Sequence, residues 1–172
     1  TIPDSVTSIE NYAFSGCSNL TSITIPDSVT SIGYSAFRDC SNLTSISIPD
    51  SVESIGGDAF DGCKNLKDIY ITSIESWCNI DFSYGVFDYN ADINLYSNGE
   101  LVKNLVIPYG VTKINSYAFE NIGSITSVIM PNTVTSIGNQ AFYNCSNLAS
   151  INIPDSVTKI GDQAFAGCSR LA

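Results

Sequence analysis

The chain has no histidine among its 172 residues. Histidine is the commonest metal ligand and the usual base in Ser-His-Asp and Cys-His catalytic arrangements, so these chemistries are excluded. No G-x-S-x-G turn and no glycine-rich nucleotide-binding motif occurs. The acidic residues fall in turns and loops, and do not form the acid and base that a glycosidase holds across a cleft. We therefore expect a protein that is not an enzyme and holds no cofactor.

Cations are scarce as well, with 7 lysines and arginines against 17 aspartates and glutamates and a formal net charge of −10 at pH 7. Nucleic acid binding needs clustered cations that displace counterions from phosphate. An anionic membrane surface attracts the same kind of cluster. No run of about 18 apolar residues is present either. The composition excludes nucleic acid as a partner and membrane insertion of this segment.

What the chain has in abundance is self-similarity at a stride of 23 residues. Most of one unit is CSNLTSITIPDSVTSIGYSAF, from Cys17 to Phe37, and the next unit begins at Cys40. A repeat of this length is typical of a solenoid, in which stacked coils place equivalent residues about 4.8 Å apart. We expect one continuous spine of stacked rings from the recurring phenylalanines: Phe14, Phe37, Phe60, Phe87, Phe119, Phe142 and Phe165.

Each regular unit combines a strand, a turn and a short helical segment. Ile23 and Ile25 have the two-residue spacing of a strand with one buried face. Pro26 cannot donate to a ladder, so it ends the strand and opens a turn with Asp27. Gly33 indicates a position that tolerates positive φ. The spacing of one helical turn with an inward face follows at Ala36, Phe37 and Cys40.

One unit departs from this stride, because Ile71 and Ile107 are 36 residues apart, 13 more than a regular unit allows. In its first part, the i, i+3, i+4 spacing of Ile74, Trp77 and Cys78 predicts a short amphipathic helix capped by Ser73.

In its second part, Asn98-Gly99 predicts a two-residue hairpin turn joining strands at about 93–96 and 101–105. The chain is thus a single domain, 1–172, with regular repeats at 1–71 and 107–172 and an irregular repeat at 72–106.

These units resemble the leucine-rich repeats of the BspA-like, or treponemal, type. Leu20-x-x-Ile23-x-Ile25 matches the leucine-rich core of that family. Its own signature is matched by Ile25-Pro26, Ile32-Gly33 and Ala36-Phe37-x-x-Cys40. The resemblance implies a curved solenoid of the α/β horseshoe class, mostly parallel β with short helical turns, in seven coils of which one is irregular. It also implies strands on the concave face and a surface protein of host-associated bacteria or parasitic protists, some of which adhere to host proteins.

The cysteines and aspartates of the repeat are candidate ligands, but neither pattern predicts a metal site. Zinc sites use C-x-x-C pairs, which are absent, and parallel columns hold their Cβ atoms farther apart than a disulfide prefers. The turn position of Asp4, Asp27 and Asp50 explains these residues without calcium. We expect buried free thiols that behave as small apolar groups in the cysteine column: Cys17, Cys40, Cys63, Cys145 and Cys168.

The outward strand positions are the candidate binding surface. Between the two strand isoleucines most units carry a small polar residue, but the middle units carry Tyr70, Val106 and Ile129, which we expect to lie side by side. Strand propensity alone explains these residues. The alternative is an apolar contact patch flanked by the Asn98-Gly99 hairpin. The candidate binding residues on these strands are Asp68, Tyr70, Asn104, Val106, Ser127 and Ile129.

We therefore predict a non-catalytic, cell-surface or secreted domain that binds a host or neighbouring-cell extracellular protein in adhesion. Two alternatives are a structural spacer that projects another domain and a repeat region attached to an extracellular enzyme. Because the chain begins and ends inside a repeat, we expect a fragment of a longer array whose uncapped ends could associate end to end.

Overall fold

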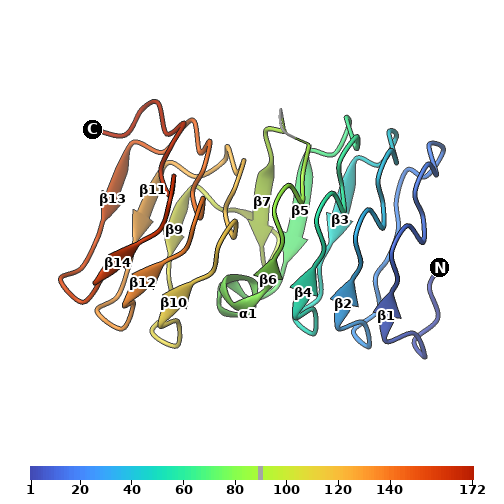
Figure 1. Ribbon diagram of the computed structural model, residues 1–172, viewed down its shortest axis with the longest axis horizontal. Coiled ribbons are helices and arrows are strands. Elements are labelled where there is room, and N and C mark those ends of the chain that lie inside the picture. The colour runs from blue at the N-terminus through green and yellow to red at the C-terminus, as the bar shows by residue number, and fades with distance from the viewer. Residues whose placement is uncertain (89–90) are drawn as a thin grey trace.

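The computed structural model describes residues 1–88 and 91–172, and shows a solenoid whose coils stack along the long axis of Figure 1. Residues 89–90 of the irregular unit lie outside the described residues. One side, the long-strand face, is formed by β3 (Ser45–Ser47), β5 (Asp68–Ile71), β7 (Asn94–Ser97), β8 (Glu100–Leu101), β9 (Asn104–Val106), β11 (Ser127–Ile129) and β13 (Ser150–Asn152). The other side, the short-strand face, is formed by β1 (Ser8–Ile9), β2 (Ser31–Ile32), β4 (Ser54–Ile55), β6 (Asp81–Phe82), β10 (Lys113–Ile114), β12 (Ser136–Ile137) and β14 (Lys159–Ile160).

The apolar columns of the repeat form one continuous core between these two faces. Ile46 of β3 and Ile48, which directly follows this strand, are buried on one side, while Ile32 of β2 is buried on the opposite side, and each is at most 3% exposed. Fully burying such a side chain contributes about 1.5–3 kcal/mol. A single 23-residue unit could not bury these residues alone, so stacking of neighbouring coils is what makes the core. The predicted solenoid is confirmed.

Side-chain donors also join each coil to the one before it. The thiols of Cys40, Cys63, Cys145 and Cys168 each donate to the carbonyl oxygen of a phenylalanine in the preceding coil, at 3.1–3.2 Å. All six cysteines are free, as expected for the five of the column. The cysteine column therefore supplies hydrogen-bond donors as well as apolar volume. The expectation that the whole column is buried is wrong at its two ends, because Cys17 is exposed and Cys168 is half-buried.

Glycine is required at Gly33 and at the equivalent Gly56 for a different reason from the one expected. Positive φ angles fall two residues after Gly33 and Gly56, at Ser35 (52°) and Asp58 (54°), and not at these glycines. A Cβ atom on Gly33 would lie 2.6 Å from the backbone nitrogen of Asn11 in the preceding coil. Close approach of neighbouring coils, not backbone conformation, therefore requires glycine at this position.

The helix predicted in the irregular unit is confirmed as α1 (Ile74–Asn79). The Ser73 hydroxyl caps it by accepting from the backbone N–H of Ser76 at 3.1 Å. The helix lies between β6 and β10 on the short-strand face (Figure 1). There Asn115, which follows β10, donates from its side-chain amide to the carbonyl oxygens of Asn79 and Ile80. In the described part of the chain, no helix has the length and hydropathy to cross a membrane.

The predicted hairpin is also present, but its second strand is shorter than expected. Strands β7 and β8 pair in antiparallel fashion around Asn98 and Gly99, whose φ angles are 51° and 80°. The expected continuation to Leu105 is wrong, because Asn104 to Val106 form β9, which pairs in parallel with β11 of the next coil. The long-strand face is consequently divided into two sheets, ordered β3-β5-β7-β8 and β13-β11-β9.

The phenylalanine spine is divided at the same place. Rings stack at 5.2–5.8 Å from Phe14 to Phe87 in the first half, and at 5.2–5.5 Å from Phe119 to Phe165 in the second. Between them, Ile93 forms a bridge with Ile122. The expectation of one continuous spine is therefore wrong, because the chain turns back at the hairpin after β7 before another phenylalanine is reached.

Candidate binding surface on the long-strand face

The predicted binding residues all lie on the long-strand face, but the structure separates them into two clusters. Tyr70 belongs to the sheet that ends with β7 and β8. Val106 and Ile129 belong to the sheet formed by β9, β11 and β13. The expectation that these three side chains lie side by side is therefore wrong, because a strand and a hairpin arm lie between β5 and β9.

The first cluster, which we call the aliphatic pair, consists of Val106 and Ile129. These residues are direct partners in the parallel register of β9 and β11 and are 57% and 52% exposed. Beside them, the hydroxyl of Ser127 donates to the side-chain oxygen of Asn104 at 2.8 Å. Neighbouring strands are about 4.8 Å apart, so the two side chains form one exposed apolar patch with a polar border.

The second cluster, which we call the tyrosine pair, consists of Tyr70 and Tyr96. Their rings stack with centroids 4.8 Å apart and an interplanar angle of 23°. Two residues earlier on the same strands, the side-chain amide of Asn94 donates to the carboxylate of Asp68 at 3.0 Å. Desolvation and the nearby Asp68 carboxylate raise the pKa of Tyr96. The pair is thus a rigid aromatic surface on adjacent strands β5 and β7.

Sequence reasoning missed Tyr96 because it was assigned only to a hairpin. Its strand also pairs in parallel with β5, with Tyr96 opposite Tyr70 and Leu95 opposite Ile69. The sequence carries one signal for this, since Leu95 and Tyr96 have the same apolar-aromatic order as Ile69 and Tyr70.

A cleft of about 490 Å³ lies beside the hairpin, between β8 and β9. Its lining includes Ser97, Glu100 and Leu101 from the hairpin together with Asn104 and Val106 from β9. The hairpin turn is fixed because the Asn98 amide donates to the carbonyl oxygen of Thr72 at 3.1 Å. Val106 of the aliphatic pair therefore borders this cleft, whose opposite wall is the hairpin.

One acidic residue of the repeat turns, Asp50, has a structural partner. Asp50 accepts a hydrogen bond from the backbone N–H of Ser73 in the following coil at 3.1 Å, and so joins two coils in addition to its expected place in the turn. Within residues 1–88 and 91–172, no group of three or more histidine, cysteine, aspartate or glutamate side chains is placed to hold a metal ion. What the long-strand face offers is contact surface, in two preformed apolar clusters with polar borders.

Parallel strands stacked at a 23-residue stride, with inward leucine and isoleucine columns, define a leucine-rich repeat solenoid. More specifically, the chain belongs to the family of BspA-type leucine-rich repeats, because the model of the BspA type leucine rich repeat region matches residues 1–94 and 91–172, with 6 copies. Among proteins of curated function, none matches the chain.

Two solved structures are similar to this chain, and the first of them shares its fold. A leucine-rich repeat protein of T. pallidum, TpLRR, is 30% identical with a TM-score of 0.60, over 97% of this chain and 72% of that one. A leucine-rich cell surface protein of Faecalibacterium prausnitzii is 23% identical with a TM-score of 0.41, over 96% of this chain and 69% of that one.

Proposed function

We propose that this chain is a non-catalytic recognition domain, secreted or displayed on a bacterial cell surface, that binds an extracellular protein of a host or neighbouring cell. The observation that carries the proposal is the aliphatic pair, where Val106 and Ile129 lie side by side and more than half exposed. Neither side chain contributes to the core, so burial does not account for two large apolar groups placed together in water, although strands favour both residue types.

The surroundings of the aliphatic pair have the composition of a protein-binding surface. Interfaces combine an apolar centre with a polar border, and tyrosine is over-represented among the residues that dominate binding energy. Here Asn104 and Ser127 supply polar groups beside the aliphatic pair, and the tyrosine pair supplies rigid aromatic area across the hairpin. An irregular loop on a rigid scaffold is also where binding residues are concentrated.

A structural spacer is the second candidate. The outward residues of the outer strands are small and polar, such as Thr24, Ser47 and Asn152. A spacer needs only such a surface and has no use for the aliphatic pair. A repeat region attached to an extracellular enzyme is compatible with either role.

The test is surface plasmon resonance of the chain against a panel of purified host extracellular proteins. Because the two clusters lie on different sheets, each needs its own variant: Val106→Ser with Ile129→Ser, and Tyr70→Ala with Tyr96→Ala. We expect the first to weaken binding at least about tenfold, since truncating a dominant contact costs about 2 kcal/mol or more. Tyr109→Ala is the matched control, because Tyr109 is exposed but lies outside both clusters.

Equal affinity in the wild type and in the Val106/Ile129 variant would reject this surface as the binding site. No measurable binding by the wild type across the panel would favour the spacer. Circular dichroism should show the same fold for every variant, because all the substituted side chains face outward.

A further inference from the structure

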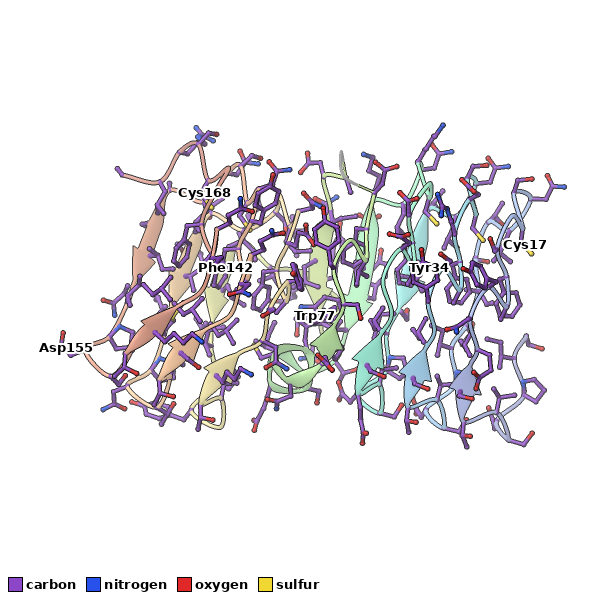
Figure 2. The ribbon with its side chains drawn as sticks, in the orientation of Figure 1. Cys17, Tyr34, Trp77, Phe142, Asp155 and Cys168 are labelled. Atoms are coloured by element: carbon purple, nitrogen blue, oxygen red, sulfur yellow. The ribbon has the colours of Figure 1, made fainter. Side chains whose placement is uncertain are left out.

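The short-strand face carries a second surface feature that the proposed function does not use. An open groove of about 600 Å³ runs across β1, β2, β4 and β6, and its lining includes Glu10, Ser31, Ser54, Tyr34 and Tyr84. Figure 2 labels Tyr34 in the N-terminal half of the solenoid, away from Trp77 of α1. The groove therefore extends from the regular coils of β1, β2 and β4 to β6 of the irregular unit, on the other face of the molecule from the aliphatic pair.

The ring of Tyr34 is held in place although 40% of the residue is exposed. Its hydroxyl donates to the carboxylate of Asp58 in the next coil at 2.8 Å. The edge of the ring meets Tyr12 of the preceding coil, with centroids 5.5 Å apart and an interplanar angle of 78°. This bond to Asp58 raises the pKa of Tyr34. The aromatic surface is thus fixed before any ligand arrives.

Gly57 is what allows this arrangement. It occupies the same column as Tyr34 and Tyr84, one coil from each. A Cβ atom there would lie 3.6 Å from the Cδ2 atom of Tyr34 and 2.9 Å from the carbonyl oxygen of Tyr84. Without a side chain at Gly57, the ring of Tyr34 extends over the next coil and the floor between the two tyrosines stays open.

Tyr84 forms the other end of the groove and is 67% exposed. Its ring meets the edge of Tyr117, with centroids 6.0 Å apart. Only the coil of Gly57 lies between those of Tyr34 and Tyr84, so the two aromatic surfaces are two strand spacings, about 10 Å, apart along the solenoid axis. An elongated ligand would contact both.

The groove is polar beside the tyrosine column. Ser31, Ser54 and Asp81 are aligned in the parallel register of β2, β4 and β6. Their side chains line the groove in a column three residues before the tyrosine column, and Glu10 adds a carboxylate from the coil that precedes Tyr34. A wholly apolar ligand would leave these groups unsatisfied. An anionic ligand would be repelled by the carboxylates of Glu10 and Asp81.

We propose that this groove binds a neutral oligosaccharide or polysaccharide chain, with sugar rings packed on Tyr34 and Tyr84. A pyranose ring has an apolar C–H face that packs on an aromatic ring and a rim of hydroxyl groups that bond to serine and carboxylate oxygens. Uncharged sugars match both the aromatic ends and the acidic, hydroxyl-rich floor. The site is independent of protein binding at the aliphatic pair.

The test is isothermal titration calorimetry of the 172-residue chain with neutral hexasaccharides, namely cellohexaose, chitohexaose, mannohexaose and maltohexaose. An oligogalacturonate of the same length is the anionic comparison. We expect saturable binding of at least one neutral sugar with a Kd below about 10 mM. Tyr34→Ala and Tyr84→Ala should each weaken it roughly tenfold, while Tyr109→Ala should leave it unchanged.

Tyr34→Phe separates positioning from stacking, because it keeps the ring and removes the bond to Asp58. Its affinity should fall between those of wild type and Tyr34→Ala. No binding of any neutral hexasaccharide below about 10 mM would overturn the proposal. Unchanged affinity in both alanine variants would overturn it too, as would equal binding of the oligogalacturonate. A protein ligand lost in Tyr34→Ala, with no sugar bound, would assign the groove to peptide recognition instead. None of these outcomes affects the Val106/Ile129 experiment.

Discussion

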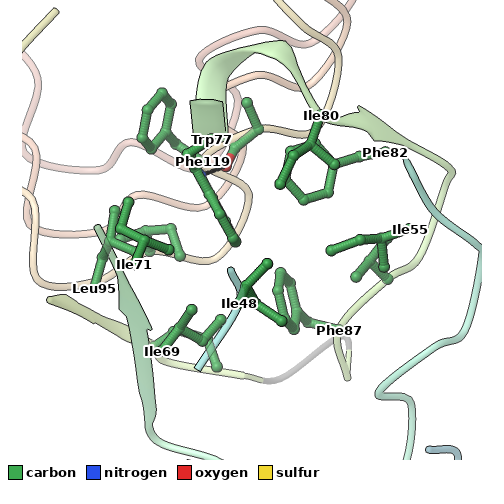
Figure 3. Close-up of a cluster of buried hydrophobic side chains, with 14 of the residues drawn as sticks. Ile48, Ile55, Ile69, Ile71, Trp77, Ile80, Phe82, Phe87, Leu95 and Phe119 are labelled. Atoms are coloured by element: carbon green, nitrogen blue, oxygen red, sulfur yellow. Dashed lines mark hydrogen bonds between the residues drawn. The ribbon is translucent and has the colours of Figure 1, made fainter. Parts of the chain in front are cut away.

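Replacing Trp77 tests how the two halves of the solenoid are joined. Trp77 lies in α1 and is 1% exposed, and its indole N–H donates to the carbonyl oxygen of Ala118 at 2.7 Å. Its ring meets the edge of Phe82, with centroids 5.0 Å apart (Figure 3). Phe82 belongs to the N-terminal half and Ala118 to the C-terminal half. One side chain thus packs against both sides of the break in the phenylalanine spine.

The size of the effect follows from these contacts. Truncating a buried tryptophan to alanine costs about 3–5 kcal/mol through lost burial and the cavity that remains. A small domain has a total free energy of unfolding of about 5–15 kcal/mol, so the loss is a large fraction of it. Trp77→Phe keeps most of the apolar contact but leaves the Ala118 carbonyl without this donor, which costs about 1–3 kcal/mol.

The assay is urea denaturation followed by far-ultraviolet circular dichroism, since both variants remove the only tryptophan and its fluorescence. We expect the free energy of unfolding to fall in the order wild type, Trp77→Phe, Trp77→Ala. Tyr109→Ala should stay within about 0.5 kcal/mol of wild type, because the side chain is on the surface. A loss below about 1 kcal/mol in Trp77→Ala would refute the view that Trp77 holds the join together.

Three further predictions concern the thiols, one buried carboxyl and the outer coils. Cys17 should react with a thiol reagent in the native protein, whereas Cys63, whose pKa burial raises to about 12, should react only after unfolding; finding two or more disulfides would contradict this. Burial raises the pKa of Glu120 from 4.5 to about 7, so the folded chain retains a proton that the unfolded chain loses. The free energy of unfolding should therefore fall as the pH rises across that interval, and Glu120→Gln should abolish this contribution; an identical pH dependence in both proteins would argue against it. The half-buried rings of Phe14 and Phe165 lie in the outer coils, so sedimentation at rising concentration should reveal end-to-end association, and a strictly monomeric chain would count against it.

The sequence by itself determined the features that depend on short-range signals. The 23-residue stride fixes the solenoid, because only stacking buries its apolar columns. The helix at Trp77 follows from its spacing and the Ser73 cap, and the hairpin follows from Asn98-Gly99. Each of these features is specified within a few neighbouring residues or by repetition, so no knowledge of distant contacts is needed.

Only the tertiary structure decided how the chain continues across the irregular unit. Pairing of β7 with β5 places Tyr96, not Val106, beside Tyr70, and the hairpin then separates the two sheets. Trp77 similarly reaches Ala118 only because α1 lies against β10. Spacing along the chain cannot reveal such contacts, because an insertion breaks the correspondence between position in the sequence and position in the stack. Which coils then become neighbours is set by backbone pairing and side-chain packing between segments far apart in the sequence.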